Sequence, residues 1–357
     1  MTNDLINRWI RPEVRALAAY HVPDSHGFIK LDAMENPYSL PEALIESWLE
    51  TLRQLELNRY PDASAGLLKE RLQQYLGLGV DQEILLGNGS DELIQILAMA
   101  VAGENRTILA PEPSFVMYRI IAQSLGMQYV GVPLNDQDFS LDMPEMLAAI
   151  EKHQPAVIFL AYPNNPTGNL FDQKDIEAIL EASNGLVIID EAYHSFAQVS
   201  WIDDMHHYEN LLVMRTLSKI GLAGLRIGML VGPKQWLDQL NKIRLPYNIN
   251  ALSQASATFM LKHVDVFDQQ AAQIRADRQF MFDSLSQHSK IEVWSSYANF
   301  LLLRSEKSQE IFDSLKQNNI LIKNLDGAHK KLAQCLRVTI GTMEENNAFL
   351  KVIELQN

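Results

Sequence analysis

Four side chains that could act together on one small molecule stand between residues 190 and 226. They are the carboxylate of Asp190, the phenol of Tyr193, the amine of Lys219 and the guanidinium of Arg226. A lysine amine forms a Schiff base with an aldehyde, an acidic group keeps a pyridine nitrogen protonated, and a guanidinium holds a phosphate. Pyridoxal phosphate carries an aldehyde, a pyridine nitrogen and a phosphate, so the combination of side chains predicts that it is the cofactor.

The position of Lys219 also favours a role in chemistry. Residues 211–215 form an apolar run that predicts a buried strand, and Thr216, Ser218 and Lys219 follow at its end. Open α/β sheets bind their ligands at the carboxyl ends of the strands. Partial burial there would lower the pKa of the lysine and make its neutral, nucleophilic form accessible.

Asp190 ends another apolar run, residues 186–190. A helix N-cap for the following segment and a functional carboxylate are both open interpretations of this residue. A carboxylate buried at the end of an apolar strand needs a positive partner, which a pyridinium nitrogen would supply. Tyr193 could direct its hydroxyl to the oxygen of the same ring, or it could pack in the core with that hydroxyl satisfied.

A second group of residues could hold the phosphate. Residues 87–92, Gly-Asn-Gly-Ser-Asp-Glu, precede a predicted helix, and the backbone N–H groups around Ser90 and Asp91 suit an anion. Ordinary helix capping would use the same residue types. Arg226 and the Ser218 hydroxyl could add hydrogen bonds to the same phosphate.

Three more residues could contact the cofactor or the substrate. Asn165 lies in the loop 162–168, where two prolines and a glycine also favour a rigid turn, and its amide could bond the ring oxygen. Phe115 follows a predicted strand and could stack on the pyridine ring, although such aromatics are usually core residues. Arg337 lies in the apolar run 335–340 and needs an anion, either from a substrate or from a structural salt bridge.

The elements that must position these residues follow a βα pattern from about residue 84 to 232. Apolar runs predict strands of a mostly parallel sheet, buried on both faces, at residues 107–110, 129–132, 156–161, 186–190, 211–215 and 227–231. Apolar residues at helical spacing predict helices at residues 41–55, 67–76, 90–102, 114–124 and 173–181. Beyond residue 250, the pattern predicts one long helix at about 254–286, then strands at 298–304 and 336–340 with a helix between them.

These elements predict an α/β fold with two domains. The large domain comprises residues 41–250 and contains the mostly parallel sheet that would bind the cofactor. The smaller domain comprises residues 251–357 and is of the α+β type. Residues 1–40 form an N-terminal arm that we expect to join the small domain.

Composition narrows the class of protein. The chain has 44 acidic and 30 basic residues and a formal charge of -14, which argues against binding to nucleic acid or to an anionic membrane. A single cysteine excludes an internal disulfide and is typical of a reducing compartment. The first residues lack signal-peptide features and no apolar run would span a bilayer, so we expect a cytoplasmic protein. The histidines lack zinc-site spacing, so no metal is expected.

The residues singled out above match a known family. Asn165-Pro-Thr-Gly, Asp190-Glu-Ala-Tyr193, Ser218-Lys219 and Arg226, in this order, resemble the aspartate-aminotransferase-like superfamily of pyridoxal-phosphate enzymes, fold type I. Motifs at residues 31–38, 59–62, 87–92, 217–226 and 336–341 look like those of the class II histidinol-phosphate aminotransferases and span nearly the whole chain. The resemblance implies a sheet of the seven-stranded type flanked by helices.

The resemblance also implies roles for the cofactor-binding residues. Lys219 would form the Schiff base, Asp190 would pair with the pyridine nitrogen, and Asn165 and Tyr193 would contact the ring oxygen. Phe115 would lie on the ring. Phosphate contacts would come from Ser90, Asp91, Thr216, Ser218, Arg226 and, across a homodimer interface, Tyr60 of the partner subunit.

On the substrate side, the resemblance implies transamination between L-histidinol phosphate and 2-oxoglutarate, which gives imidazole acetol phosphate and L-glutamate in histidine biosynthesis. Arg337 would hold the carboxylate of glutamate or the phosphate of histidinol phosphate, and Tyr20 and Asn36 are further candidates. Lys323 stands where a second substrate arginine is common, and lysine holds an anion as a point charge without the planar fork.

Other departures from the family pattern leave the cofactor groups in place. Met34 and Phe115 stand where Asn and Tyr are common, and Lys219 and Arg226 are one residue closer than in many relatives. Two alternatives share the fold: an aromatic or broad-range aminotransferase, and a phosphothreonine-type decarboxylase. A pyridoxal-phosphate-sensing transcription regulator would carry an N-terminal winged helix, which we do not expect here because the enzyme-like pattern begins by about residue 30 and the chain is acidic.

Overall fold

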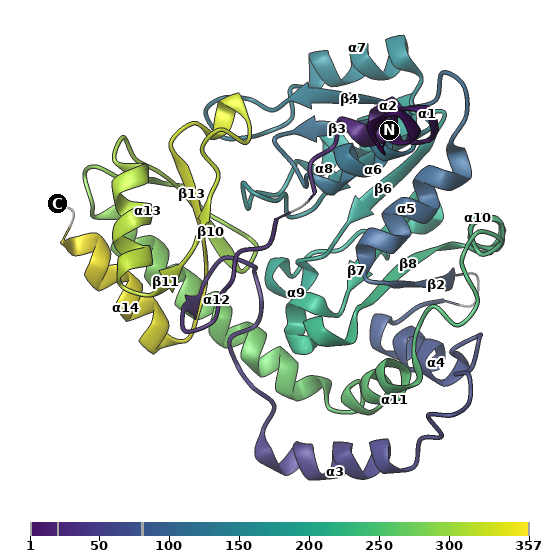
Figure 1. Cartoon of the computed structure of the whole chain (residues 1–357), viewed down its shortest axis with the longest axis horizontal. Helices are drawn as coiled ribbons and strands as arrows, with labels where there is room; N and C mark the ends of the chain where they lie inside the picture. The colour runs from purple at the N-terminus through teal and green to yellow at the C-terminus, as the bar shows by residue number, and fades with distance from the viewer. Residues whose placement is uncertain (1, 20, 80–81, 356–357) are drawn as a thin grey trace.

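The structure, a computed structural model, describes residues 2–19, 21–79 and 82–355. Figure 1 shows a large sheet surrounded by helices and, beside it, a smaller sheet with helices coloured green to yellow. The fold is therefore α/β, as the sequence predicts. Among the described residues, no helix combines the length and the apolar character that crossing a membrane requires.

The large sheet has seven strands in the order β2-β8-β7-β6-β5-β3-β4. The strands are β2 (Gln82–Asn88), β3 (Thr107–Glu112), β4 (Gln128–Pro133), β5 (Val157–Ala161), β6 (Leu186–Asp190), β7 (Leu211–Thr216) and β8 (Ile227–Pro233). From β7 to β4 all neighbours are parallel, whereas β8 is antiparallel to both β7 and β2. The prediction of a mostly parallel sheet is confirmed, with β8 as the reversed strand.

Helices bury both faces of this sheet. They are α4 (Gly66–Leu76), α5 (Ser90–Val101), α6 (Met117–Ser124), α7 (Met143–His153), α8 (Gln173–Ala182), α10 (Lys234–Leu240) and α11 (Ala251–Met260). Two further helices lie farther out: α3 (Glu42–Arg53) packs on α11, and α9 (His194–Ala197) packs on α12 (Val264–Ser286). Alternate residues of β5 belong to different core clusters, with Ile158 and Leu160 in one and Val157 and Phe159 in the other. Continuous apolar runs therefore mark these strands because both faces exclude water.

A smaller antiparallel sheet, in the order β12-β13-β10-β9, packs with three helices. Its strands are β9 (Glu292–Val293), β10 (Phe300–Arg304), β12 (Lys323–Asn324) and β13 (Cys335–Thr339), and the helices are α12 (Val264–Ser286), α13 (Ser308–Gln317) and α14 (Met343–Glu354). At the start of the chain lie α1 (Thr2–Trp9), α2 (Pro12–Arg15) and β1 (Ile29–Lys30), and β1 pairs with β11 (Ile320–Leu321). The domain boundaries at residues 40 and 250 stay a prediction.

Two helix predictions are wrong in their bounds. The predicted continuous helix at 254–286 is two helices, because α11 ends at Met260 and α12 begins at Val264. His263 between them has φ -125° and ψ 38°, outside the helical region, and neither proline nor glycine marks this break in the sequence. The helix predicted from residue 114 begins at Met117.

The strand β8 passes very close to the beginning of α5. An ideal Cβ on Gly228 would lie 2.5 Å from the carbonyl carbon of Gly89 and 2.6 Å from the backbone nitrogen of Ser90. The Gly89 N–H also donates a hydrogen bond of 2.8 Å to the carbonyl of Arg226, which holds the two segments together. Only glycine at position 228 allows this approach.

We expect Gly228→Ala to destabilise the protein by about 1–3 kcal/mol, because backbone atoms must move to admit the methyl group. The midpoint of urea unfolding, followed by circular dichroism, measures the change. Gly224→Ala is the matched control, since a Cβ at Gly224 meets no atom within 4 Å. Equal midpoints for Gly228→Ala and the wild type would contradict the close approach.

Candidate active site

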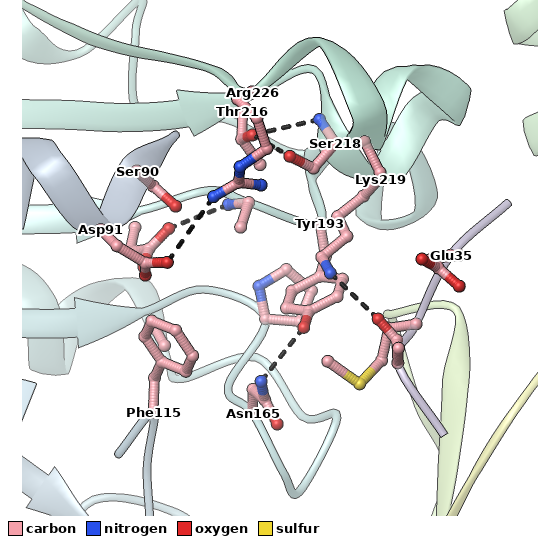
Figure 2. A pocket seen from close by; sticks show the side chains of 17 residues that line it. Glu35, Ser90, Asp91, Phe115, Asn165, Tyr193, Thr216, Ser218, Lys219 and Arg226 are labelled. Atoms are coloured by element: carbon pink, nitrogen blue, oxygen red, sulfur yellow. Dashed lines mark hydrogen bonds and ion pairs between the residues drawn. The ribbon is translucent and has the colours of Figure 1, made fainter. Parts of the chain in front are cut away.

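A cavity of about 240 Å³ opens at the carboxyl ends of the central strands. The last residues of β5, β6 and β7 (Ala161, Asp190 and Thr216) all line it. Figure 2 shows side chains from several elements directed toward this space. The cavity lining includes every cofactor residue that the sequence predicts within one chain: Ser90, Asp91, Phe115, Asn165, Asp190, Tyr193, Thr216, Ser218, Lys219 and Arg226.

Lys219 follows β7 in the short turn Ser218–Leu222, in which Gly221 has a φ of 127°, and Lys219 lines the cavity. The Nζ atom donates to the carbonyl of Ala33 over 3.3 Å and lies 5.7 Å from the centroid of the Tyr193 ring. Burial, followed by the positive charge of Arg337, lowers the pKa of Lys219 from 10.5 to about 8. A lysine with this pKa has a substantial neutral, nucleophilic fraction near neutral pH.

Asp190 ends β6 and is only 5% exposed. Its Oδ2 accepts a hydrogen bond of 2.6 Å from the Tyr118 hydroxyl, and its Oδ1 accepts one of 3.1 Å from the Ala192 N–H. Burial raises the pKa of this carboxyl from 3.8 to about 6. Among the described basic side chains, none forms an ion pair with Asp190, so a cation in the cavity would be its natural partner.

Arg226 and the beginning of α5 enclose one end of the cavity. The Arg226 Nη2 lies 3.9 Å from the Asp91 Oδ2. A Cβ on Gly89, whose φ is +81°, would lie 2.5 Å from the same Nη2, so the guanidinium sits directly against the backbone at the helix start. Thr216 and Ser218 add hydroxyl groups, which are hydrogen-bonded to each other over 2.9 Å. Guanidinium, hydroxyls and a helix N-terminus together suit a phosphate.

Asn165 connects the cavity with β13. Its Nδ2 donates to the Tyr193 Oη over 3.1 Å, and its Oδ1 accepts a hydrogen bond of 2.6 Å from the Arg337 Nη1. Another guanidinium nitrogen of Arg337 donates to the carbonyl of Asp32 over 3.0 Å. Arg337 thus lies behind the cavity wall, one side chain away from the predicted ring-oxygen contacts.

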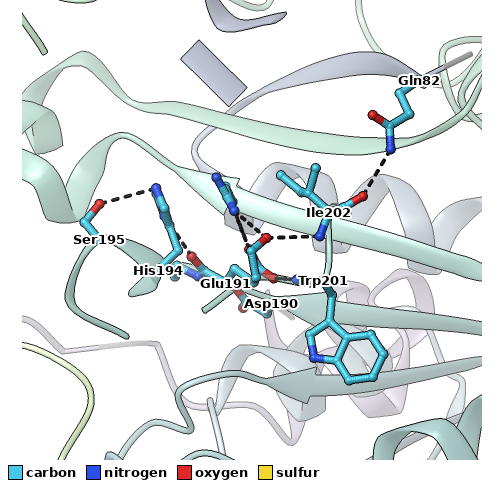
Figure 3. A network of polar contacts seen from close by, with 10 residues as sticks. Gln82, Asp190, Glu191, His194, Ser195, Trp201 and Ile202 are labelled. Carbon is cyan, nitrogen blue, oxygen red and sulfur yellow. Dashed lines mark hydrogen bonds and ion pairs between the residues drawn. The ribbon is translucent and has the colours of Figure 1, made fainter. Parts of the chain in front are cut away.

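The segment after Asp190 is anchored by the buried carboxylate of Glu191 (Figure 3). Glu191 accepts hydrogen bonds from the Arg215 Nε at 2.8 Å, the Trp201 N–H at 2.5 Å and the Ser200 hydroxyl at 3.0 Å. This ion pair satisfies two buried charges at once. It fixes the chain on both sides of the site, because Arg215 belongs to β7 and Glu191 directly follows Asp190.

Three of the predicted substrate residues, Arg337, Asn36 and Lys323, lie outside the cavity lining. Asn36 donates to the carbonyl of Ile220 and to the Gln270 Oε1, both over 2.8 Å. Lys323 of β12 pairs in register with Arg337 of β13.

Tyr60, which is predicted to reach the site from a partner subunit, does not line this cavity. Tyr60 is 80% exposed and stacks on Tyr247, with ring centroids 4.6 Å apart. Tyr20 lies outside the described residues.

Sequence reasoning missed Tyr118 and Glu35. Glu35 lines the cavity and forms an ion pair with Lys30. Tyr118 lies at the start of α6, whereas Phe115 precedes this helix, so helical spacing does not relate the two residues. An aromatic residue at a helix start is ordinarily a core residue, so the sequence alone does not single Tyr118 out.

Comparisons with known proteins agree with this geometry. The family "Aminotransferase class I and II" matches residues 26–353. The chain is 55% identical to "Histidinol-phosphate aminotransferase 2" of Nitrosococcus oceani over 356 residues, which cover 99% of each chain.

Solved structures show the same fold. The histidinol-phosphate aminotransferase of Sinorhizobium meliloti, solved in complex with pyridoxal-5'-phosphate, superposes with a TM-score of 0.86 at 22% identity and covers 98% of both chains. The L-threonine-O-3-phosphate decarboxylase of Porphyromonas gingivalis superposes with a TM-score of 0.78 at 24% identity, covering 92% of this chain and 99% of its own. The fold is thus shared by different activities, whereas the family match and the sequence identity are specific: this chain belongs to the class I and II aminotransferases, in the histidinol-phosphate aminotransferase family.

Proposed function

We propose that this chain catalyses the pyridoxal-phosphate-dependent transfer of an amino group between L-histidinol phosphate and 2-oxoglutarate, giving imidazole acetol phosphate and L-glutamate in histidine biosynthesis. The observation that carries the proposal is the Lys219 amine facing the same cavity as the buried Asp190, in a chain 55% identical to a named histidinol-phosphate aminotransferase. The amine can form the Schiff base with the aldehyde of the cofactor, and the carboxylate can pair with its pyridine nitrogen.

The donor set of the cavity fits pyridoxal phosphate. Asp190 is a buried anion without a basic partner among the described residues, which suits a protonated ring nitrogen. The Arg226 guanidinium and the start of α5 suit the phosphate, and the polar atoms of Asn165 and Tyr193 suit the ring oxygen. The aromatic ring of Phe115 lines the same space and would cover the pyridine ring. When bound, the cofactor supplies an aldehyde and a pyridine ring that accepts electrons as a substrate bond breaks.

The residues of this chain then bind, orient and move protons. Lys219 would hold the cofactor through its Nζ, and the same Nζ, when free, would take the proton from the substrate Cα as a general base. Asp190, by remaining ionised, would hold a proton on the ring nitrogen. Burial serves both residues, because it keeps part of the lysine neutral and strengthens the attraction between the carboxylate and a cation.

Substrate recognition would involve Arg337 and Lys323. Because these residues are direct partners on antiparallel strands, their side chains project from the same face of the small sheet. A substrate carboxylate or phosphate would take the place of Asn165 Oδ1 as the acceptor for the Arg337 guanidinium. Asn36 and Tyr20 are further candidates, proposed from the resemblance alone.

We also propose that the protein is a cytoplasmic homodimer in which the active sites lie at the interface. Tyr60 is 80% exposed in a single chain. The resemblance to the family implies that this tyrosine contacts the phosphate of the cofactor. In the dimer, Tyr60 of the partner subunit would reach the phosphate of the cofactor.

An assay with separate amino donors tests the activity. Histidinol phosphate, phenylalanine, tyrosine and aspartate are each offered with 2-oxoglutarate, and glutamate formation is measured. We expect histidinol phosphate to be used with the highest kcat/KM. Comparable use of the aromatic amino acids would favour a broad-range aminotransferase, and carbon dioxide release from a phosphorylated amino acid would favour a decarboxylase.

Removal of the Lys219 amine should abolish turnover. A positioned general base contributes about 10²–10⁴-fold, and Lys219→Ala also loses the covalent attachment of the cofactor, so we expect at least this loss in kcat. Steady-state glutamate formation measures it, and equilibrium dialysis shows whether the cofactor still binds. Lys152→Ala, in the exposed part of α7, is the control and should keep wild-type activity. Near-normal turnover by Lys219→Ala would refute the mechanism.

The lowered pKa of Lys219 predicts the pH dependence of cofactor attachment. At pH 7 an amine with a pKa of about 8 is about one-tenth neutral, whereas one with the ordinary lysine pKa is less than about a thousandth neutral. The rate at which apoprotein reacts with pyridoxal phosphate should therefore rise about tenfold per pH unit below about pH 8 and level off above it. Stopped-flow absorbance measures this rate.

The same reaction with N-acetyl-lysine amide is the control, because pyridoxal phosphate titrates in the same way in both reactions and only the amine differs. A plateau that begins only near the ordinary lysine pKa of 10.5 would contradict the burial of this amine.

A further inference from the structure

Tyr118 makes the shortest hydrogen bond to Asp190. Its hydroxyl donates to the Asp190 Oδ2 over 2.6 Å, compared with 3.1 Å for the bond from the Ala192 N–H to Oδ1. Tyr118 is fully buried in α6 and lies behind the carboxylate, outside the residues that line the cavity. Each of these bonds uses one lone pair of a carboxylate oxygen. The remaining lone pairs can accept hydrogen bonds from a group in the cavity that Asp190 lines.

Aromatic contacts hold the Tyr118 ring in one orientation. The ring stacks on Phe159 of β5, with centroids 4.6 Å apart and planes 6° apart. On another side it meets Phe115 edge to face, with centroids 5.5 Å apart and planes at 85°. Phe115 itself lines the cavity. One short segment of chain therefore positions both the aromatic wall of the site and the donor to its buried carboxylate.

The electrostatics give this hydrogen bond a definite direction. Burial and the nearby Asp190 raise the pKa of Tyr118 well above its ordinary value, so the phenol stays a neutral donor. Burial raises the pKa of Asp190 to about 6, and the carboxylates of Asp91 and Glu191 add to this rise. The bonds from Tyr118 and from the Ala192 N–H oppose it, because they stabilise the ionised form. The pKa of Asp190 therefore lies only a little below neutral pH, so a further rise would leave part of the carboxyl protonated.

We propose that Tyr118 is a positioning residue for the transamination: its hydroxyl fixes the plane of the Asp190 carboxylate and keeps that carboxylate ionised toward the ring nitrogen of the cofactor. This inference rests on the proposed function, since it assigns a partner to the group that the cofactor requires. Tyr118 acts through Asp190 and does not touch the cofactor or the substrate.

Tyr118→Phe tests the inference, because it keeps the ring and removes only the hydroxyl. In the apoprotein, ¹³C NMR of labelled aspartate should show the Asp190 carboxyl titrating above its wild-type pKa of about 6. In the loaded protein, ¹⁵N NMR of labelled pyridoxal phosphate should show a smaller protonated fraction of the ring nitrogen at neutral pH. The loss of one hydrogen bond to a charged group predicts a fall in kcat of about tenfold to a hundredfold, with little change in KM.

Tyr38→Phe is the matched control, because the Tyr38 hydroxyl donates to the Asp277 Oδ2 over 3.1 Å, away from the cavity lining. It removes the same kind of tyrosine–aspartate bond and should leave both NMR signals and kcat unchanged, whatever it does to the melting temperature. If Tyr118→Phe changes only the melting temperature, its role is structural and the inference is wrong. If the wild type itself does not bind pyridoxal phosphate, the proposed function fails instead.

Discussion

A carboxylate withdrawn from water at the end of a central strand is the constraint on which the site depends. Asp190 is 5% exposed and receives two hydrogen bonds, but no basic side chain of the described residues is its ion-pair partner. Such a charge is costly unless a cation compensates it. A protonated ring nitrogen of pyridoxal phosphate would compensate the charge, and the cavity that Asp190 lines offers space for that ring.

The arrangement of the strands brings the other groups to the same place. β5, β6 and β7 are adjacent and parallel, so their carboxyl ends meet at one edge of the sheet. Lys219 lies just past the end of β7, and the start of α5, which we propose binds the phosphate, is held against β8 by the close contact between Gly89 and Gly228. Burial then acts oppositely on the two reactive groups, since it lowers the pKa of Lys219 and raises that of Asp190. Both titrate closer to neutral pH as a result.

Much of this arrangement could be predicted from the sequence, because strands buried on both faces are continuous apolar runs and their last residues can be read directly. Lys219 and Asp190 were located in this way. Tyr118 was not, since only the fold brings it to a carboxylate 72 positions away. The break before Val264 was also missed, because no proline or glycine marks it. The role of Tyr60 depends on a second subunit, so a single chain leaves it a prediction, as it does the domain boundaries.

The covalent attachment of the cofactor to one lysine is the most direct test of the whole interpretation. The protein is incubated with pyridoxal phosphate, reduced with borohydride and digested, and the modified peptide is identified by mass spectrometry. The structure predicts a single reduced adduct on the peptide that contains Lys219, which lines the same cavity as Asp190. An adduct confined to other lysines, or no adduct at all, would contradict it.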